Sequence, residues 1–314
     1  MTVRWGFIGA GYVAKQAMGP AVHAAHGATL RAVASRDAER SQTLEPEIVH
    51  ESYDALLADP TIDAVYISLT NVQHAQWVIA ALNAGKHVLC EKPLAMNADE
   101  VRTMMVAAER NNRLLVEAVW TRWQPRMMRM ADIVRQGTLG DVTAISSSFT
   151  FRGDLTGNYR SLPEYGGGAL LDVGCYQAHL WMMLLNEHIT FTPESVKRTM
   201  SETGVDLTTV IRAHLNDSVE VHASCSFDLP PSQNILVSGT NATMSTGEGE
   251  AFTLWKQPAT LLVGDTVEHF PADDAFALMV ESVSANILEE TEPLFPVRSS
   301  FRVAEILDVI RSIG

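Results

Sequence analysis

The chain has little cysteine and a shortage of basic side chains. Its three cysteines, Cys90, Cys175 and Cys225, have no spacing typical of a zinc or redox motif, so we expect no disulfide framework, no metal and a reducing, cytoplasmic environment. The chain has 23 Lys and Arg residues and 37 Asp and Glu residues, which gives a formal net charge of −14. This charge disfavours nucleic acid and anionic membrane surfaces as partners.

Long apolar runs are also absent. No uninterrupted stretch approaches the ~18 apolar residues that a membrane-spanning helix needs, and residues 1–5 lack the basic start and apolar run of a secretory signal. We therefore expect no membrane contact. Hydrophobic residues make up 46% of the 314 and charged residues 19%, which is typical of a globular protein of about two domains.

The first third alternates short apolar runs with helical patterns. The runs occupy residues 3–8, 30–34, 64–69, 87–90 and 114–119, and helical patterns at 75–84 and 98–110 lie between them. The runs lack polar alternation, as expected for parallel strands that helices bury on both faces. The pattern predicts an α/β fold whose N-terminal domain, residues 1–119, is a doubly wound Rossmann sheet.

The pattern changes after Pro125. A helical segment at 126–136 precedes a strand at 142–151, and strand-like runs separated by turn residues fill 195–269. Helical patterns at 273–289 and 299–313 follow. These features predict a second α/β domain, residues 120–314, built on an antiparallel sheet for substrate binding and oligomerisation. The sequence leaves open whether the last helix, 299–314, packs within this domain or back on the Rossmann domain.

A glycine-rich turn follows the first predicted strand. It reads Gly9-Ala10-Gly11-Tyr12-Val13-Ala14, a dinucleotide-binding fingerprint with alanine in the third position. The first glycine allows a tight turn, and the second lets the backbone approach a pyrophosphate. Amides at the following helix N-terminus then face the phosphates. The alternative is a glycine turn that serves packing alone.

The end of the second strand indicates which cofactor binds. NAD-selective sites usually carry an acidic residue here for the ribose hydroxyls, whereas this chain reads Ser35-Arg36-Asp37. A hydroxyl and a guanidinium can bind a 2′-phosphate, so Ser35 and Arg36 favour NADP over NAD, with NAD still possible. In the alternative interpretation Arg36 is a solvated residue and Asp37 an N-cap.

Two further segments carry titratable side chains. Glu91 and Lys92 follow a predicted strand at the carboxyl edge of the sheet, where open parallel sheets bind ligands, although Glu-Lys-Pro is also an ordinary turn. Downstream, Asp172, Tyr176 and His179 fall within roughly 60° of one another on an otherwise apolar helix. Burying three titratable groups on such a helix costs free energy, which indicates that these groups have a function.

Together these motifs resemble one known family. The glycine turn, the stretch from Asn71 to His74, Glu91-Lys92-Pro93 and the helix after Gly166-Gly167-Gly168 are similar to those of the glucose-fructose oxidoreductase, inositol dehydrogenase and MocA family. The segment 117–123 with Pro125 is most similar to the dimeric dihydrodiol and D-xylose dehydrogenase branch. The C-terminal third carries no matching motif.

The resemblance implies a fold, a cofactor site and a catalytic residue. It implies a Rossmann domain followed by an α/β domain on an open, largely antiparallel sheet whose outer face forms a homodimer or homotetramer interface. It implies a catalytic or substrate-orienting Lys92. Inositol dehydrogenases carry histidine at the position of Tyr176, so the tyrosine argues against inositol. The expected cofactor-binding residues are Gly9, Gly11, Tyr12, Val13, Ser35, Arg36, Thr70, Asn71, His74, Glu91 and Lys92.

The predicted reaction is hydride transfer between NADP(H) and a carbinol or carbonyl carbon of a sugar, polyol or vicinal diol. Tyr176 takes the hydroxyl proton, Lys92 stabilises the phenolate and the alkoxide, and Asp172 orients Lys92 or shares in proton transfer. His179, Arg160, Trp120 and Arg122 are expected to line the substrate. Two alternatives are redox-assisted glycoside cleavage or epimerisation with a tightly bound cofactor, and a regulator that binds dinucleotide without catalysis.

Overall fold

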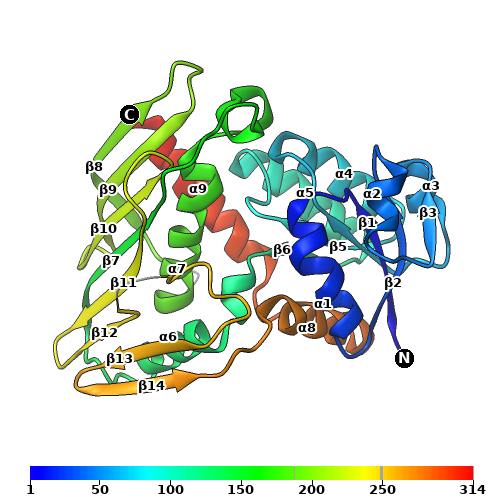
Figure 1. Ribbon diagram of the computed structural model, residues 1–314. Helices are drawn as coiled ribbons and strands as arrows, with labels where there is room; N and C mark the ends of the chain where they lie inside the picture. Colours follow the sequence, from blue (N-terminus) through cyan, green and yellow to red (C-terminus); the bar gives the residue numbers. More distant parts are fainter. Residues whose placement is uncertain (187, 248–249, 314) are drawn as a thin grey trace. The chain divides into compact units, whose positions relative to one another are not determined.

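The computed structural model describes residues 1–186, 188–247 and 250–313 and divides into two compact units (Figure 1). Unit 1 comprises Met1–Trp120 together with Asp274–Phe301, and unit 2 comprises Thr121–Asp273 together with the chain from Arg302 onward. Residues 274–301, which the sequence pattern assigned to the second domain, are thus grouped with unit 1. The division between units also falls within the last helix, α9 (Val297–Ser312).

Unit 1 contains the predicted parallel sheet. Its strands are β1 (Val3–Ile8), β2 (Ala28–Ala34), β3 (Ile48–His50), β4 (Ala64–Ile67), β5 (His87–Glu91) and β6 (Leu115–Ala118). They lie in the order β3-β2-β1-β4-β5-β6, and all neighbouring pairs are parallel. Trp5, Phe7 and Ile8 of β1 are completely buried, because helices cover both faces. The predicted Rossmann sheet is therefore confirmed.

Helices connect these strands and cover the sheet. They are α1 (Gly19–Ala24), α2 (Ala38–Gln42), α3 (Tyr53–Ala58), α4 (Asn71–Asn83), α5 (Ala98–Asn111) and α8 (Ala275–Glu289). Asn97 caps α5, since its side chain accepts a hydrogen bond from the amide of Glu100 at 2.9 Å. The indole Nε1 of Trp5 in β1 donates to Ser284 Oγ in α8 at 3.1 Å, which ties this late helix to the sheet.

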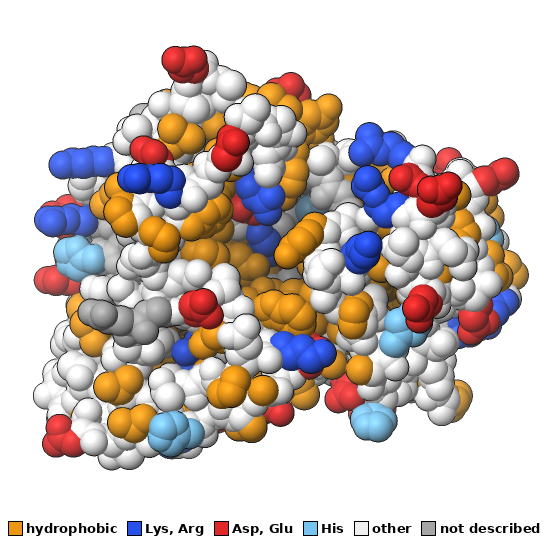
Figure 2. All heavy atoms as spheres, in the orientation of Figure 1, with side chains coloured by type: hydrophobic (Ala, Val, Ile, Leu, Met, Phe, Trp, Pro, Cys, Tyr) orange, Lys and Arg blue, Asp and Glu red, His pale blue; other side chains and the backbone are white. Residues whose placement is uncertain are grey.

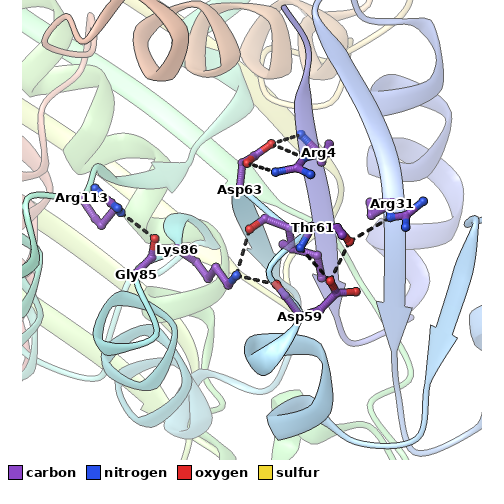
Figure 3. Close-up of polar contacts among 9 residues, drawn as sticks. Arg4, Arg31, Asp59, Thr61, Asp63, Gly85, Lys86 and Arg113 are labelled. Carbon is purple, nitrogen blue, oxygen red and sulfur yellow. Dashed lines mark hydrogen bonds and ion pairs between the residues drawn. The ribbon is translucent and has the colours of Figure 1, made fainter.

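A polar network stabilises the amino edge of this sheet (Figure 3). The ammonium group of Lys86, just before β5, donates to the carbonyls of Asp59 at 2.7 Å and Ile62 at 2.9 Å. Arg4 of β1 holds Asp63, which precedes β4, through two side-chain hydrogen bonds of 2.9 and 2.7 Å. The network joins the strand starts, and the glycine turn lies at the opposite, carboxyl edge. We therefore assign these residues a structural role, the stabilisation of the sheet.

Unit 2 is built on an eight-stranded sheet. The strands are β7 (Val142–Thr150), β8 (Phe191–Met200), β9 (Asp206–Leu215), β10 (Val219–Ser226), β11 (Ser232–Gly239), β12 (Thr243–Ser245), β13 (Ala259–Val263) and β14 (Thr266–Phe270). The order is β14-β13-β12-β11-β7-β10-β9-β8, and only β7 and β10 pair in parallel. The predicted open, largely antiparallel sheet, and with it the α/β class, is confirmed.

One face of this sheet is covered by helices. These are α6 (Pro125–Arg135), the π-helical segment η5 (Leu170–Gly174) and α7 (Cys175–Leu185), which continues η5. On the surface seen in Figure 2, acidic and basic side chains are interspersed and form no large patch of one sign. Within the described residues, no helix is long and apolar enough to cross a membrane.

Candidate active site

The glycine turn has the conformation that its sequence predicts. Gly9 adopts a φ of +97°, and a Cβ there would lie 2.3 Å from the carbonyl oxygen of Ser68, so only glycine fits. At Gly11 the nearest atom to an added Cβ is Ser68 Oγ at 3.6 Å, an ordinary contact. Gly9 is thus required by the fold, whereas Gly11 leaves open backbone where a phosphate can approach.

A surface pocket of about 540 Å³ lies beside this turn within unit 1. It is lined by Ala10, Gly11, Tyr12, Lys15, Asp37, Glu39, Arg40 and Thr43. Lys15 and Arg40 supply its positive charge, and the sequence interpretation included neither. Arg36, which it did include, is not among the lining residues. Burial raises the pKa of Tyr53, and the nearby guanidinium of Arg36 opposes that rise, which places Arg36 close to Tyr53.

Ser35 and Asp37 shape the start of α2 at the edge of this pocket. Ser35 Oγ donates to the carbonyl of Asp37 at 2.6 Å, and Asp37 Oδ1 accepts the amide of Arg40 at 3.0 Å. Asp37 is therefore the N-cap of α2, as the alternative interpretation holds. Arg40 lies in the first turn of this short helix, on the segment that follows β2. That position was the signal by which the sequence could have identified it.

Glu91 and Lys92 lie at the carboxyl end of β5. The hydroxyl of the fully buried Tyr66 in β4 donates to Glu91 Oε1 at 2.7 Å, and the amide of Lys92 donates to Glu91 Oε2 at 3.3 Å. Burial raises the pKa of Glu91, although the Tyr66 hydrogen bond and the charge of Lys92 both oppose the rise. Glu91 therefore sets the geometry and the electrostatic environment of Lys92.

Two buried residues hold the chain that follows Lys92. The ring of His74 is fully buried, with Nδ1 2.9 Å from the carbonyl oxygen of Pro93 and Nε2 3.2 Å from that of Leu69. The amide of Leu94 donates to Glu117 Oε1 at 2.9 Å. Burial lowers the pKa of His74. The geometry favours a positioning role for His74 over its expected contact with the cofactor, which stays a prediction.

In unit 2 the glycine triplet brings Arg160 to the start of the helical segment that carries Asp172 and Tyr176. A Cβ at Gly167 would lie 2.3 Å from the carbonyl oxygen of Arg160. Gly168 has a φ of +112°, and its Cβ would lie 2.2 Å from Asp206 Oδ1. The amide of Gly168 donates to the carbonyl of Arg160 at 2.9 Å. Glycine is needed here for close backbone approach.

Arg160 forms an ion pair with Asp172. Its Nε donates to Asp172 Oδ2 at 2.7 Å, and its guanidinium lies 4.8 Å from the ring centre of Tyr159. Burial lowers the pKa of Arg160, but the carboxylate of Asp172, Tyr159 and Tyr176 more than offset this effect, and the pKa is raised. The charge of Arg160 therefore acts on both Asp172 and Tyr176.

The predicted stripe of titratable side chains is buried within unit 2. Asp172 belongs to η5, and Tyr176 and His179 to α7, with exposed fractions of 7%, 8% and 1%. Single π-helical turns within α-helices are frequent at functional sites. The sequence pattern predicted a regular 3.6-residue helix, and the structure instead has a π-helical turn at Asp172.

An aromatic cluster packs around Tyr176. Its ring centre lies 5.7 Å from that of Phe149 in β7 and 6.2 Å from that of Phe252. Phe149 and Phe252 are stacked, with an interplanar angle of 5°. The sequence interpretation included neither phenylalanine, because they come from segments far from the helix motif. The alternation of polar and apolar residues in β7 predicts that Phe149 lies in the core, but it does not predict that Phe149 contacts Tyr176.

The remaining expected substrate residues are buried. Trp120 is 5% exposed and stacks on Phe276 of α8 with ring centres 5.7 Å apart, and Arg122 is 4% exposed. Their role toward substrate stays a prediction. Within the described ranges no three His, Cys, Asp or Glu side chains are grouped in a way that could hold a metal ion.

Comparison with known proteins identifies the family. Residues 3–118 match the model of an oxidoreductase family with an NAD-binding Rossmann fold, and residues 127–245 match the GFO/IDH/MocA C-terminal domain. The chain is 32% identical to D-xylose 1-dehydrogenase (NADP(+)) 2 of Haloferax volcanii, over 98% of this chain and 95% of the relative. The chain belongs to the Gfo/Idh/MocA oxidoreductase family.

Other relatives within the Gfo/Idh/MocA family agree with this assignment. Trans-1,2-dihydrobenzene-1,2-diol dehydrogenase of Mus musculus is 32% identical over 86% of this chain and 80% of its own. The crystal structure of KijD10, a 3-ketoreductase from Actinomadura kijaniata in complex with NADP and TDP-benzene, matches with a TM-score of 0.91 and 27% identity, covering 100% and 98% of the two chains. The predicted resemblance and the named branch are confirmed, and the oxidoreductase interpretation is favoured over both alternatives.

Proposed function

We propose that this protein is an NADP(H)-dependent dehydrogenase or reductase that acts on a CH–OH or carbonyl group of a sugar, polyol or vicinal diol. Relatives named for D-xylose, for a dihydrodiol and for a 3-keto group support this substrate class. The observation that carries the proposal is the ion pair between the half-buried Arg160 and the buried Asp172, next to Tyr176. A charged group of this kind is costly in a protein that only binds a dinucleotide.

The residues of unit 1 fit a dinucleotide with a 2′-phosphate. The turn at Gly9 and Gly11 leaves backbone accessible, and the helix that starts at Tyr12 directs its first amides toward that space. Arg40 and Lys15 supply cationic groups at the neighbouring pocket. They also offset Asp37 and Glu39 in its lining. We assign the 2′-phosphate to Arg40 and Lys15 together with Ser35, with Arg36 as a further candidate.

The nicotinamide, when bound, supplies hydride acceptance and donation. Tyr176 exchanges the hydroxyl proton of the substrate. Arg160 and Lys92 favour its phenolate form by their positive charge, and Lys92 also stabilises the developing alkoxide. Asp172 neutralises and orients Arg160. Asp172, which was expected to orient Lys92, thus has a charge partner in Arg160 within unit 2. The catalytic roles of Lys92, Tyr176 and Asp172 stay predictions.

The surroundings of Tyr176 support a substrate with one apolar face. The buried rings of Phe149 and Phe252 keep the surroundings of Tyr176 apolar, and Arg160 offers a hydrogen-bond donor for hydroxyl oxygens. His179 is nearly inaccessible in α7, so we assign it the support of Tyr176 rather than direct contact.

We further propose a cytoplasmic homo-oligomer. All three cysteines are free and buried, which suits a reducing compartment. Leu236, Leu262 and Val267 lie in one cross-strand row, with Ser245 of β12 between the first two, and have exposed fractions of 41%, 38% and 50%. Such an apolar row supports an interface between two copies of the sheet.

A substrate screen tests the proposed function. Purified protein is mixed with NADP⁺ or NAD⁺ and with aldoses, polyols, inositols and trans-diols, and cofactor reduction is followed by absorbance. We expect NADP⁺ reduction with at least one aldose or diol and none with inositols. Tight NADPH binding with no turnover on any member of the panel would instead support a regulator.

A further inference from the structure

Unit 2 buries one arginine that takes no part in the proposed chemistry. Arg126, in the first turn of α6, is 2% exposed. Its Nη2 donates to the carbonyl of Ala251 at 2.9 Å, and longer contacts of 3.5 Å reach the carbonyls of Glu250 and Thr260. Its Nε, also buried, has no hydrogen-bond partner among the described residues. Carbonyl groups therefore satisfy the guanidinium only in part.

Among the described residues, no carboxylate forms an ion pair with Arg126, in contrast to Arg129 on the same helix, which binds Glu268 at 2.8 Å. Burial lowers the pKa of Arg126 to about 10, so the group is still cationic at neutral pH. A buried cation without a counter-charge is costly, and an anion that could reach it would bind favourably.

A cavity of about 220 Å³ adjoins this arginine. Its lining includes Arg126, Thr246, Thr260 and His269, with Leu254 and Phe270 as apolar wall. Thr246 Oγ1 accepts the amide of Ile235 at 3.0 Å, so its hydroxyl hydrogen is available to donate. Glu250 also lines the cavity, but its side chain is exposed and solvated. The cavity thus combines a buried cation with neutral donors.

We propose that this cavity binds a small oxyanion, a phosphate or a carboxylate, with Arg126 as its charge partner and Thr246 and His269 as additional donors. The volume accommodates one such ion with some water. A planar guanidinium is well suited to two oxygens of one anion. The site lies within unit 2 and is distinct from the phosphate-binding pocket of unit 1.

Binding at this site acts on the aromatic cluster around Tyr176. Arg126 holds the carbonyl of Ala251, and Gln124 Nε2 donates to the carbonyl of Leu254 at 2.7 Å. The segment between these two anchors carries Phe252, whose ring packs against Tyr176. An anion that fixes Arg126 therefore also restrains the segment that carries Phe252.

Thermal unfolding of cofactor-free protein with added inorganic phosphate tests the site. Chloride at equal ionic strength is the reference, and acetate forms a separate arm that identifies a carboxylate ligand. The pocket of unit 1 also attracts phosphate, so all measurements use the Arg40→Met background. We expect phosphate or acetate at ten times its Kd to raise Tm by about 2 °C over chloride, and Arg126→Met to abolish this rise. Arg135→Met, on the exposed face of α6, should retain it.

A second variant keeps the test valid if Arg126→Met does not fold. His269 is exposed in β14, so His269→Ala should fold and should weaken the Kd of the anion by roughly three- to tenfold. Equal Tm values in phosphate, acetate and chloride would overturn the proposal. So would a rise in Tm that survives Arg126→Met, or an anion Kd that is unchanged in His269→Ala.

Discussion

The Nε of Arg160 donates a 2.7 Å hydrogen bond to Asp172 Oδ2, and the charge of Arg160 also acts on Tyr176. The contact exists because the backbone of Arg160 lies directly against Gly167 and Gly168, where no side chain would fit. The glycine triplet thus fixes the position of a cation beside the proposed proton-transfer group. The predictions below test this arrangement and the parts of the molecule that support it.

Replacing Tyr176 with phenylalanine should remove the proton-transfer group and leave the packing intact. The ring would still contact Phe149 and Phe252, so folding is preserved. We expect kcat to fall by about 10²–10⁴-fold, with an unchanged Kd for NADPH. Steady-state kinetics and fluorescence titration measure the two quantities. Tyr165→Phe, at an exposed position, is the control and should retain full activity.

Asp172→Asn should impair catalysis through Arg160. The neutral amide cannot balance the guanidinium, which then shifts its position and its effect on Tyr176. We expect kcat/KM to fall by about 10–100-fold and its pH profile to move. Thermal stability should also fall, because Arg160 loses its charge partner. Asp154→Asn, in an exposed loop, serves as control. A pH profile identical to wild type would contradict a role for the ion pair.

Gly168→Ala should destabilise unit 2 strongly. The alanine would hold a φ of +112° and bring its Cβ to 2.2 Å from Asp206 Oδ1. We expect a loss of roughly 2–4 kcal/mol in the free energy of unfolding, measured by urea denaturation. Gly157→Ala is a matched control, because Gly157 also has a positive φ, +69°, but has no atom within 4 Å of the added Cβ. It should lose only about 1 kcal/mol.

Arg40→Ala should weaken NADPH more than NADH. Arg40 lines the pocket beside the glycine turn, and only NADPH carries a 2′-phosphate. We expect the Kd of NADPH to rise by about 10–100-fold and that of NADH to change less than threefold. Isothermal titration calorimetry gives both constants. Arg110→Ala, exposed at the end of α5, controls for net charge. Equal losses for both cofactors would exclude Arg40 from the 2′-phosphate site.

Asp59 is expected to contribute to the stability of the fold at neutral pH and to lose this contribution in acid. Hydrogen bonds from Thr61, assisted by His50, lower the pKa of Asp59 from 3.8 to about 2 against the opposing effect of burial. A lowered folded-state pKa stabilises the protein above the unfolded value, and this stabilisation is lost as the pH falls from about 4 to 2. Asp59→Asn should therefore cost about 1 kcal/mol at pH 7 and nothing near pH 2. Urea denaturation across this range measures it, with the exposed Asp54→Asn as control.

Regular, strongly patterned segments could be predicted from the sequence. The apolar run of β1, the Asn97 cap of α5 and the glycine turn each have a local physical cause that the residues display. The short strand β3 could not be predicted, because its three residues are only partly buried and show no periodicity. The pattern also gave no sign that α8 completes the first unit, since that depends on contacts such as Trp5 with Ser284.

The candidate site was also predictable from the sequence only in part. Asp172, Tyr176 and His179 were predictable as a group, since they share one helix. Arg40 could have been identified from its position on the segment that follows β2. The role of Phe252 and the partnership of Arg160 with Asp172 were not predictable, because they depend on neighbours distant in sequence. Arg126 carries no motif at all. Its significance lies in its burial and in backbone contacts from a segment distant in sequence.

The most direct test of the account is NADP⁺ reduction by the wild-type protein and by Tyr176→Phe with the best aldose or diol from the substrate screen. Absorbance of the reduced cofactor follows the rate, and a separate titration confirms that both proteins bind NADPH equally. The account predicts turnover in the wild type and a loss of at least about 100-fold in the variant. Equal rates in the two proteins would contradict it.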